Sequence, residues 1–163
     1  MKDDEVRGGQ AWLWAPVLLS AFGVLVSGYL SVKRFSGGSL ACTQWADCDL
    51  VNNSVYAKIY GVPVAFIGLA GYLILMGLAM AALQAEGAAQ RHLLALGFLL
   101  ALGGFGFSVY LTYLEIYVIE AICMWCVISA ILITLLTVLS GVNLRRLSQE
   151  SLHTSPTPFS LRP

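Results

Sequence analysis

The segment AICMWCVISAILITLLTVLSGV, residues 121–142, joins a Cys-x-x-Cys motif to an apolar run that contains no charged residue. A helix needs roughly 20 mostly apolar residues to cross the hydrocarbon core of a bilayer. We therefore predict that this segment spans a membrane. Its two thiols, Cys123 and Cys126, would then lie at the membrane surface, where the helix begins.

Three further segments have the length and composition of membrane spans, at about residues 12–32, 59–83 and 93–114. Apolar residues make up 58% of the 163-residue chain and charged residues 11%, whereas ordinary globular domains have about 45–50% and about 25%. These values exclude a soluble domain, and the zero net charge indicates no nucleic-acid partner. The predicted fold is an all-α integral membrane protein, a four-transmembrane-helix bundle with a long outer loop between helices 1 and 2.

The predicted domain division follows from the spans. Residues 1–142 form one membrane domain, and residues 143–163, which are rich in Ser, Thr, Pro and charge, form a disordered cytoplasmic tail. A cleaved signal peptide is the alternative for the first span. That span is longer than a 7–15-residue signal-peptide core, and no A-x-A-like site follows it. We therefore expect it to be a retained helix.

Basic residues predict the orientation, because cytoplasmic loops are enriched in Lys and Arg. With both termini in the cytoplasm, six basic residues lie inside and three lie outside; the outer ones are Lys33, Arg34 and Lys58. All four cysteines then face the outer compartment. A bacterial periplasm or an ER lumen is oxidising, so disulfides are expected there.

The four cysteines form two sequence pairs, Cys42/Cys48 in the first outer loop and Cys123/Cys126 at the last span. A helix N-terminus stabilises a thiolate, which is the attacking species in thiol–disulfide exchange. One pair is placed to face water and the other to face lipid, which suggests an electron relay. Four cysteines allow three pairings. Two inert structural disulfides and a Cys₄ zinc site are the alternatives.

The ordered set of motifs resembles the vitamin K epoxide reductase family. The resemblance rests on four helices, a C-x₅-C loop pair, Ser54 six residues after Cys48, and a Cys-x-x-Cys opening the fourth helix. The segments Ser54-Val55-Tyr56-Ala57 and Gly61-Val62-Pro63 are similar to the prokaryotic branch. The similarity extends from about residue 12 to residue 142.

This resemblance implies a membrane thiol–quinone oxidoreductase. Cys126 would exchange electrons with ubiquinone or menaquinone, Cys123 would link it to Cys48, and Cys42 would meet a thioredoxin-fold, DsbA-like partner. The tail cannot hold a thioredoxin-like domain, so the partner would be a separate protein. The expected location is the bacterial inner (plasma) membrane, among lipid. The net result would be disulfide formation outside the membrane.

The expected quinone contacts, besides Cys126, are Ser54, Ala57 and Tyr110. Ser54 could donate a hydrogen bond to a quinone carbonyl or cap a helix. Tyr110 belongs to an aromatic run in the third span, which could line a pocket or pack. Vertebrate members place Asn where Ala57 stands and Tyr where Ala130 stands, so the resemblance favours reduction of a plain quinone over the epoxide.

Other classes fit the sequence less well. In DsbB-type oxidases the Cys-x-x-Cys belongs to the first outer loop, whereas here it opens the fourth span. Small transporters place an ionisable residue in mid-membrane, and here Glu115 and Glu120 are predicted to fall at the outer edge. A small four-helix membrane protein with structural disulfides and no redox turnover is the remaining alternative.

Overall fold

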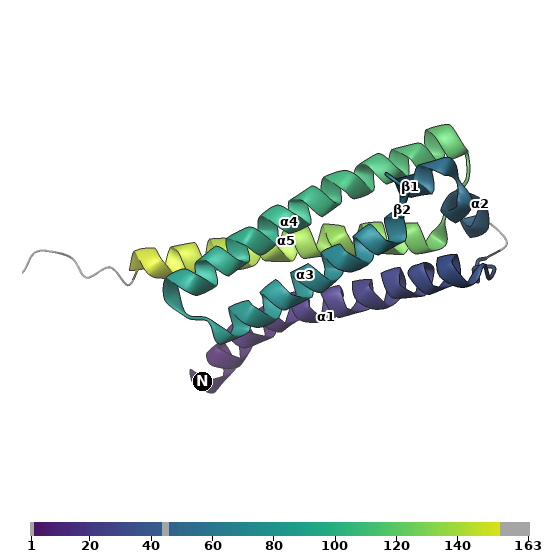
Figure 1. Cartoon of the computed structure of the whole chain (residues 1–163). Coiled ribbons are helices and arrows are strands. Elements are labelled where there is room, and N and C mark those ends of the chain that lie inside the picture. Colours follow the sequence, from purple (N-terminus) through teal and green to yellow (C-terminus); the bar gives the residue numbers. More distant parts are fainter. Residues whose placement is uncertain (1, 44–45, 154–163) are drawn as a thin grey trace, which may run out of the picture.

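Four long helices lie side by side in the computed structural model, which describes residues 2–43 and 46–153 (Figure 1). They are α1 (Lys2–Ser36), α3 (Val64–Gln84), α4 (Gly87–Leu114) and α5 (Met124–His153). Each contains a segment long and apolar enough to cross a membrane. The fold class is therefore confirmed: the protein is an all-α, multi-pass membrane protein built on a four-helix bundle.

Each long helix packs against two neighbours, so the bundle closes in the order α1, α3, α4, α5 and back to α1. Its core is a cluster of buried side chains that includes Val26, Leu30, Tyr72 and Leu136. The spans of α3 and α4 are only 11% buried. Their remaining surface is apolar, as expected for helices whose outer faces contact lipid.

The predicted start of the second span, at residue 59, is wrong. Residues before α3 form a short antiparallel hairpin, in which β1 (Lys58–Ile59) pairs with β2 (Val62–Pro63). The two turn residues, Tyr60 and Gly61, have φ angles of 51° and 84°, as a two-residue type I′ hairpin turn requires. Positive φ at two successive positions interrupts a helix, so α3 begins only at Val64.

The predicted disordered tail is wrong for residues 143–153, because α5 continues to His153. Asn143 Nδ2 donates a hydrogen bond to the carbonyl of Trp12 at 3.1 Å, and the Arg146 guanidinium lies 4.4 Å from the centre of the Trp12 ring. These contacts attach the extended helix to α1. The rest of the predicted tail, residues 154–163, lies outside the described residues.

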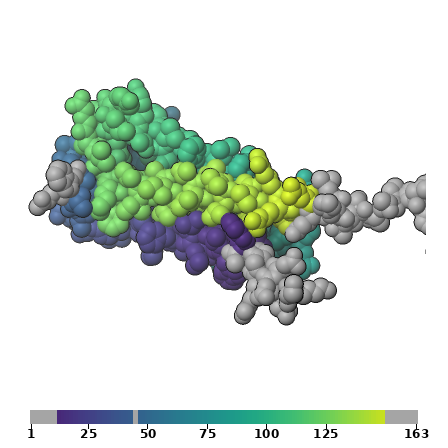
Figure 2. All heavy atoms as spheres, turned by 180° about the vertical axis from the view of Figure 1, so that it is seen from behind, coloured from purple at the N-terminus to yellow at the C-terminus, as the bar shows by residue number. Residues whose placement is uncertain are grey.

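The loop between α1 and α3 covers one end of the bundle. It contains α2 (Cys48–Asn53), a 3₁₀ turn η1 (Val55–Ala57) and the β1–β2 hairpin. The start of α1 and the end of α5 lie together at the opposite end (Figure 1). The view from behind shows the same separation, with the loop (blue) at one end and the end of α5 (yellow) at the other (Figure 2).

A close approach of α1 and α3 gives a stability prediction. The ring of Tyr72 lies directly against the backbone of Gly23, where an added Cβ would overlap the ring. Gly23→Ala is expected to destabilise the bundle by about 1–3 kcal/mol, the usual effect of overpacking a core. Gly28→Ala on the same helix is the matched control, because nothing lies within 4 Å of its Cβ position. Thermal unfolding in detergent measures both; equal midpoints would contradict the predicted contact.

Candidate functional site

The loop cysteines form a disulfide. Cys42 and Cys48 are bonded, with a Cα–Cα distance of 6.2 Å, and Cys48 is the first residue of α2. The side chain of Cys48 is only 1% exposed, whereas Cys42 is partly exposed. The flanking aspartates hold this loop: Asp47 caps α2 by accepting from the Leu50 N–H, and Asp49 accepts from the Leu40 N–H at 2.9 Å. The accessible sulfur of the pair is therefore that of Cys42.

The second pair lies at the start of α5, and both of its thiols are free. Cys123 immediately precedes the helix and is 0% exposed; its carbonyl accepts from the Val127 N–H at 3.1 Å. Hydrogen bonding from the Cys126 thiol, aided by the N–H groups of Cys126 and Trp125, lowers the pKa of Cys123 below its ordinary value. Burial and the Glu115 carboxylate oppose this effect. Cys123 is therefore a better nucleophile for thiol–disulfide exchange than a cysteine with the ordinary pKa.

Two hydrogen bonds attach the loop disulfide to the Cys-x-x-Cys segment. The Asp47 N–H donates to the Ile122 carbonyl at 3.1 Å, and Trp125 Nε1 donates to the Ala41 carbonyl at 2.9 Å. Each of these four residues immediately precedes a cysteine in the sequence. The buried sulfurs of Cys48 and Cys123 belong to the same core cluster. The fold thus brings the two sequence pairs together at the loop-covered end of the bundle.

Aromatic contacts reinforce this attachment. The rings of Tyr29 and Trp125 lie 4.9 Å apart, and the Tyr29 hydroxyl accepts from the Ala41 N–H at 3.2 Å. Lys33 Nζ lies 5.9 Å from the centre of the Tyr29 ring. The N–H and the carbonyl of Ala41, next to Cys42, are therefore bound by α1 and α5 respectively.

Removing the hydrogen bond between Trp125 and the Ala41 carbonyl should slow electron exchange between the two cysteine pairs. Trp125→Phe keeps an aromatic ring against Tyr29 but loses the bond to Ala41. One hydrogen bond contributes about 0.5–1.5 kcal/mol, so we expect exchange to slow by about two- to tenfold. Stopped-flow thiol trapping measures the rate, and Trp14→Phe, on the exposed face of α1, is the control. An unchanged rate in Trp125→Phe would show that the bond does not position the loop.

A cavity of about 380 Å³ opens beside the second pair. Its volume lies within the range of small-molecule sites, about 300–1,000 Å³. Most of the lining is apolar and comes from α3, α4 and α5. The polar groups on the wall include Ser27, Ser54, Tyr72, Glu115, Cys126 and Ser129. Cys126 is the cysteine that lines the cavity; Cys123 lies behind it in the core.

The structure places three of the four expected quinone-contact residues on this cavity: Ser54, Ala57 and Cys126. The Ser54 hydroxyl donates to the Val51 carbonyl at 2.8 Å, at the C-terminal end of α2, so it has a capping role as well as a place on the wall. Ala57 offers no hydrogen-bonding side chain. Ala130 is not among the lining residues.

Tyr110, the fourth expected quinone contact, does not line the cavity, and its side chain is 52% exposed. The lining residues of this part of α4 are Phe107, Ser108, Leu111 and Thr112. Successive residues of a helix are rotated by about 100°, which turns position 110 away from the face shared by 107 and 111. The aromatic side chain of α4 that lines the cavity is that of Phe107.

Two residues on the cavity wall were not predicted as site residues from the sequence. Glu115, expected at the outer edge, is 6% exposed and lines the cavity. It begins the π-helical turn η2 (Glu115–Ile119), and its Oε2 accepts from the Cys123 N–H at 3.1 Å. Tyr72 is also buried on the wall, where its hydroxyl donates to the Ser129 carbonyl at 2.9 Å. An acidic residue eight positions before a Cys-x-x-Cys was the one available signal for Glu115.

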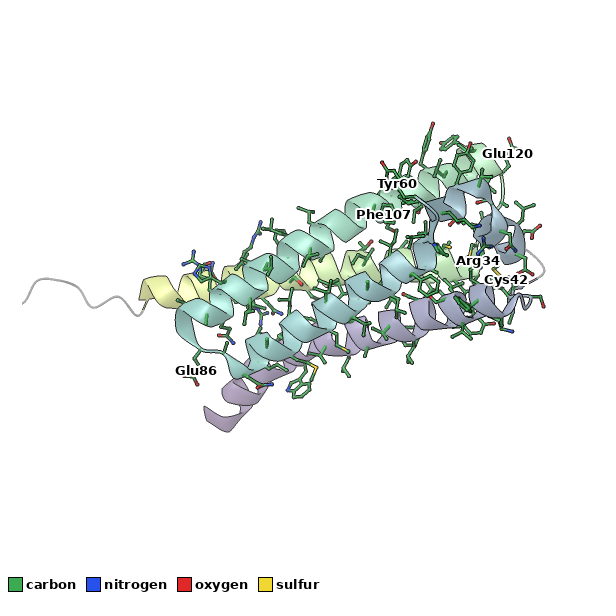
Figure 3. All side chains as sticks on the ribbon, in the orientation of Figure 1. Arg34, Cys42, Tyr60, Glu86, Phe107 and Glu120 are labelled. Carbon is green, nitrogen blue, oxygen red and sulfur yellow. A yellow bond between two sulfur atoms is a disulfide. The ribbon has the colours of Figure 1, made fainter. Side chains whose placement is uncertain are left out.

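Side chains from the loop, α1 and α5 meet at the end of the bundle where Cys42 and Arg34 lie (Figure 3). A disulfide and a dithiol brought together within a membrane helix bundle define a membrane thiol–disulfide oxidoreductase. The model of the vitamin K epoxide reductase family matches residues 14–141, most of the chain. The protein therefore belongs to the vitamin K epoxide reductase family.

Proposed function

We propose that the protein reoxidises a separate thioredoxin-fold, DsbA-like protein and passes the electrons to a quinone, so that it drives disulfide formation outside the membrane. One observation carries the proposal. Hydrogen bonds join the two segments that carry the cysteine pairs, and Cys126, the last cysteine in the proposed order of electron transfer, lines an apolar cavity. Electrons can thus enter at an accessible sulfur and leave at a membrane-embedded one.

The first step transfers electrons from the partner to the loop. A partner thiolate attacks Cys42, because Cys42 is the accessible sulfur, and Cys48 leaves as a thiolate. The second partner thiolate then attacks the mixed disulfide and releases Cys42. The partner becomes a disulfide, and the loop becomes a dithiol with two electrons and two protons gained.

The second step carries these electrons inward. The Cys48 thiolate attacks Cys123 of the oxidised Cys-x-x-Cys, and Cys126 leaves as a thiolate. Cys42 then attacks Cys48, which restores the loop disulfide and frees Cys123. The buried positions of Cys48 and Cys123 keep external thiols from intercepting this exchange. The Cys123/Cys126 dithiol is now ready to reduce an acceptor.

A benzoquinone or naphthoquinone head group fits the cavity chemically. The apolar wall suits a flat ring, and a quinone carbonyl oxygen would accept from the Ser129 hydroxyl, or from the Ser54 hydroxyl once that releases the Val51 carbonyl. Glycines contribute to the space: Gly103 and Gly104 both line it. Ubiquinone and menaquinone both belong to this chemical class. Because Ala57 lacks a hydrogen-bonding side chain, we propose a plain quinone, rather than an epoxide, as the acceptor.

The proposed location is a bacterial inner membrane, with both termini in the cytoplasm and the cysteines on the periplasmic side. The two ends of the bundle support this arrangement. The start of α1 and the end of α5, which carries Arg145 and Arg146, lie at one end, and the other end, which the loop covers, holds all four cysteines. The distribution of basic residues favours the first end as the cytoplasmic one.

A three-component assay tests the proposal. Reduced DsbA-like protein, a short-chain ubiquinone and the purified membrane protein are mixed without oxygen. We expect one quinol for each disulfide formed in the DsbA-like protein, and no reaction when the membrane protein is left out. If the thiols of the DsbA-like protein persist and all four cysteines stay unreactive, the structural-disulfide alternative is correct.

A further inference from the structure

Glu115 is a buried carboxylate at the place where the proposed reaction occurs. It is 6% exposed, lines the same cavity as Cys126, and accepts from the Cys123 N–H at 3.1 Å. The Cys126 thiol also lies within hydrogen-bonding reach of its side chain. One carboxylate thus contacts both members of the redox pair and the acceptor cavity.

The backbone around Glu115 fixes this position. Its carbonyl accepts from the Ala121 N–H at 3.1 Å and from the Glu120 N–H, which closes the π-helical turn over residues 115–119. Glu120 adopts a left-handed φ of 53°, and the chain then reverses toward Cys123. π-helical turns of this kind are frequent at functional sites. Glu115 itself keeps helical backbone angles and lies on the same face as the lining residues Leu111 and Thr112, and the turn that follows it returns the chain toward Cys123.

Burial of a carboxylate is unfavourable unless other groups compensate for the lost hydration. In the part of the chain that the structure describes, the groups acting on Glu115 are the Cys123 N–H and the Cys126 thiol; no basic side chain pairs with it. Ionisable residues within membrane segments usually have a functional role. A structural bond to Cys123 alone could be made by a neutral glutamine.

We propose that Glu115 is a catalytic residue that carries protons from the Cys126 thiol to the acceptor bound in the cavity. The inference rests on the proposed function, because it requires a quinone as electron acceptor. It adds a role for a residue that is not part of either cysteine pair.

The Cys123/Cys126 dithiol becomes a disulfide: two S–H bonds break, one S–S bond forms, and two electrons and two protons pass to the quinone, which becomes a quinol. The Glu115 carboxylate accepts the proton of Cys126 and releases it to a quinone oxygen. The proton of Cys123 follows through the hydrogen-bonded Cys126 sulfur. Glu115 ends the cycle ionised, as it began.

Glu115→Gln tests the proposal, because the amide oxygen can still accept from the Cys123 N–H but cannot carry a proton. Two rates are measured on purified full-length protein: reduction of a short-chain ubiquinone, and disulfide exchange between the two cysteine pairs after addition of dithiothreitol without quinone. We expect quinone reduction to fall by about 100-fold or more, within the usual range for a lost acid–base group. Exchange should stay within about twofold of wild type, since it transfers no proton to an acceptor in the cavity.

Two companion variants keep the result interpretable. Glu120→Gln makes the same chemical change five residues away, on an exposed side chain, and should leave both rates unchanged. Glu115→Asp retains a carboxylate and should reduce quinone at least about tenfold faster than Glu115→Gln. If Glu115→Gln does not fold, this comparison is made between Glu115→Asp and wild type across pH.

The pH profile separates proton transfer from positioning. The titratable residues that line the cavity are Tyr56, Tyr72, Glu115 and Cys126. In wild type, quinone reduction should fall at acid pH, where a protonated Glu115 cannot accept a proton. Glu115→Gln should lack this fall in rate at acid pH.

Normal quinone reduction in Glu115→Gln, or equal loss of both rates, would overturn the proton-carrier role. A wild-type protein that exchanges disulfides but leaves quinone unreduced would instead overturn the proposed function, and this step with it.

Discussion

Cys126→Ala is expected to abolish quinone reduction, with a rate at least about 1,000-fold below wild type, as when a reaction loses its nucleophile. Cys126 is the cysteine on the cavity wall, and Cys123 is fully buried behind it. No other thiol of the described residues can therefore take its place. The protein should remain folded, because the substitution removes a single half-buried sulfur.

The same variant should also stop the internal exchange at a defined point. Without Cys126, a disulfide between Cys48 and Cys123 has lost the thiol that would release it on the inner side. We expect this disulfide to accumulate and to be visible by mass spectrometry of non-reduced peptides. Thr134→Ala, an exposed change on the same helix, is the control and should reduce quinone normally. A Cys126→Ala protein that still reduces quinone would contradict the relay.

Cys48→Ala is expected to trap the partner on Cys42. When oxidised DsbA-like protein is added, the Cys42 thiolate attacks its disulfide and forms a mixed disulfide. The resolving thiol of the loop is missing, so only the partner's own second thiol can release the adduct, by reversing the attack, and a covalent complex should be visible on a non-reducing gel. In wild type the adduct should be at least about tenfold less abundant, since an adjacent thiol resolves such intermediates rapidly.

Cys42→Ala is the matched control for this trap. It leaves Cys48 as the loop thiol, but Cys48 is 1% exposed at the start of α2. A folded partner cannot reach it, so no adduct should form. Adducts of equal abundance in both variants would show that the partner does not distinguish the two sulfurs, contrary to the roles assigned to them.

Composition and the length of the apolar stretches were sufficient to predict the bundle. Four uncharged apolar stretches have few stable arrangements other than membrane-spanning helices, and the described residues contain four helices long and apolar enough to span. The ends of the helices were less predictable. The hairpin at residues 58–63 depends on positive φ at Tyr60 and Gly61, and the helix beyond Val142 depends on contacts of Asn143 and Arg146 with Trp12. These are backbone and tertiary effects that hydropathy does not report.

In the candidate site, too, some features could be predicted from the sequence and others could not. The spacing of the four cysteines predicted the chemistry, but it left three pairings open; the Cys42–Cys48 disulfide appears only in the fold. Tyr110 was misplaced because an aromatic run along a helix does not indicate which face meets the cavity. Glu115 was missed because the sequence does not show which face of α4 meets the cavity, and its bond to the Cys123 N–H appears only in the fold. Residues that act through local motifs were thus predictable, and residues whose role depends on which helix face meets the cavity were not.

Thiol counting on the quinone reaction tests the relay most directly. The purified protein is fully reduced, freed of reductant and oxygen, and mixed with excess short-chain ubiquinone; remaining thiols and quinol formed are then counted. The relay predicts that all four thiols disappear and that two quinols form per chain, since electrons of Cys42 and Cys48 must leave through Cys126. Four thiols that persist, or a single quinol with the loop thiols left intact, would contradict electron transfer between the two pairs.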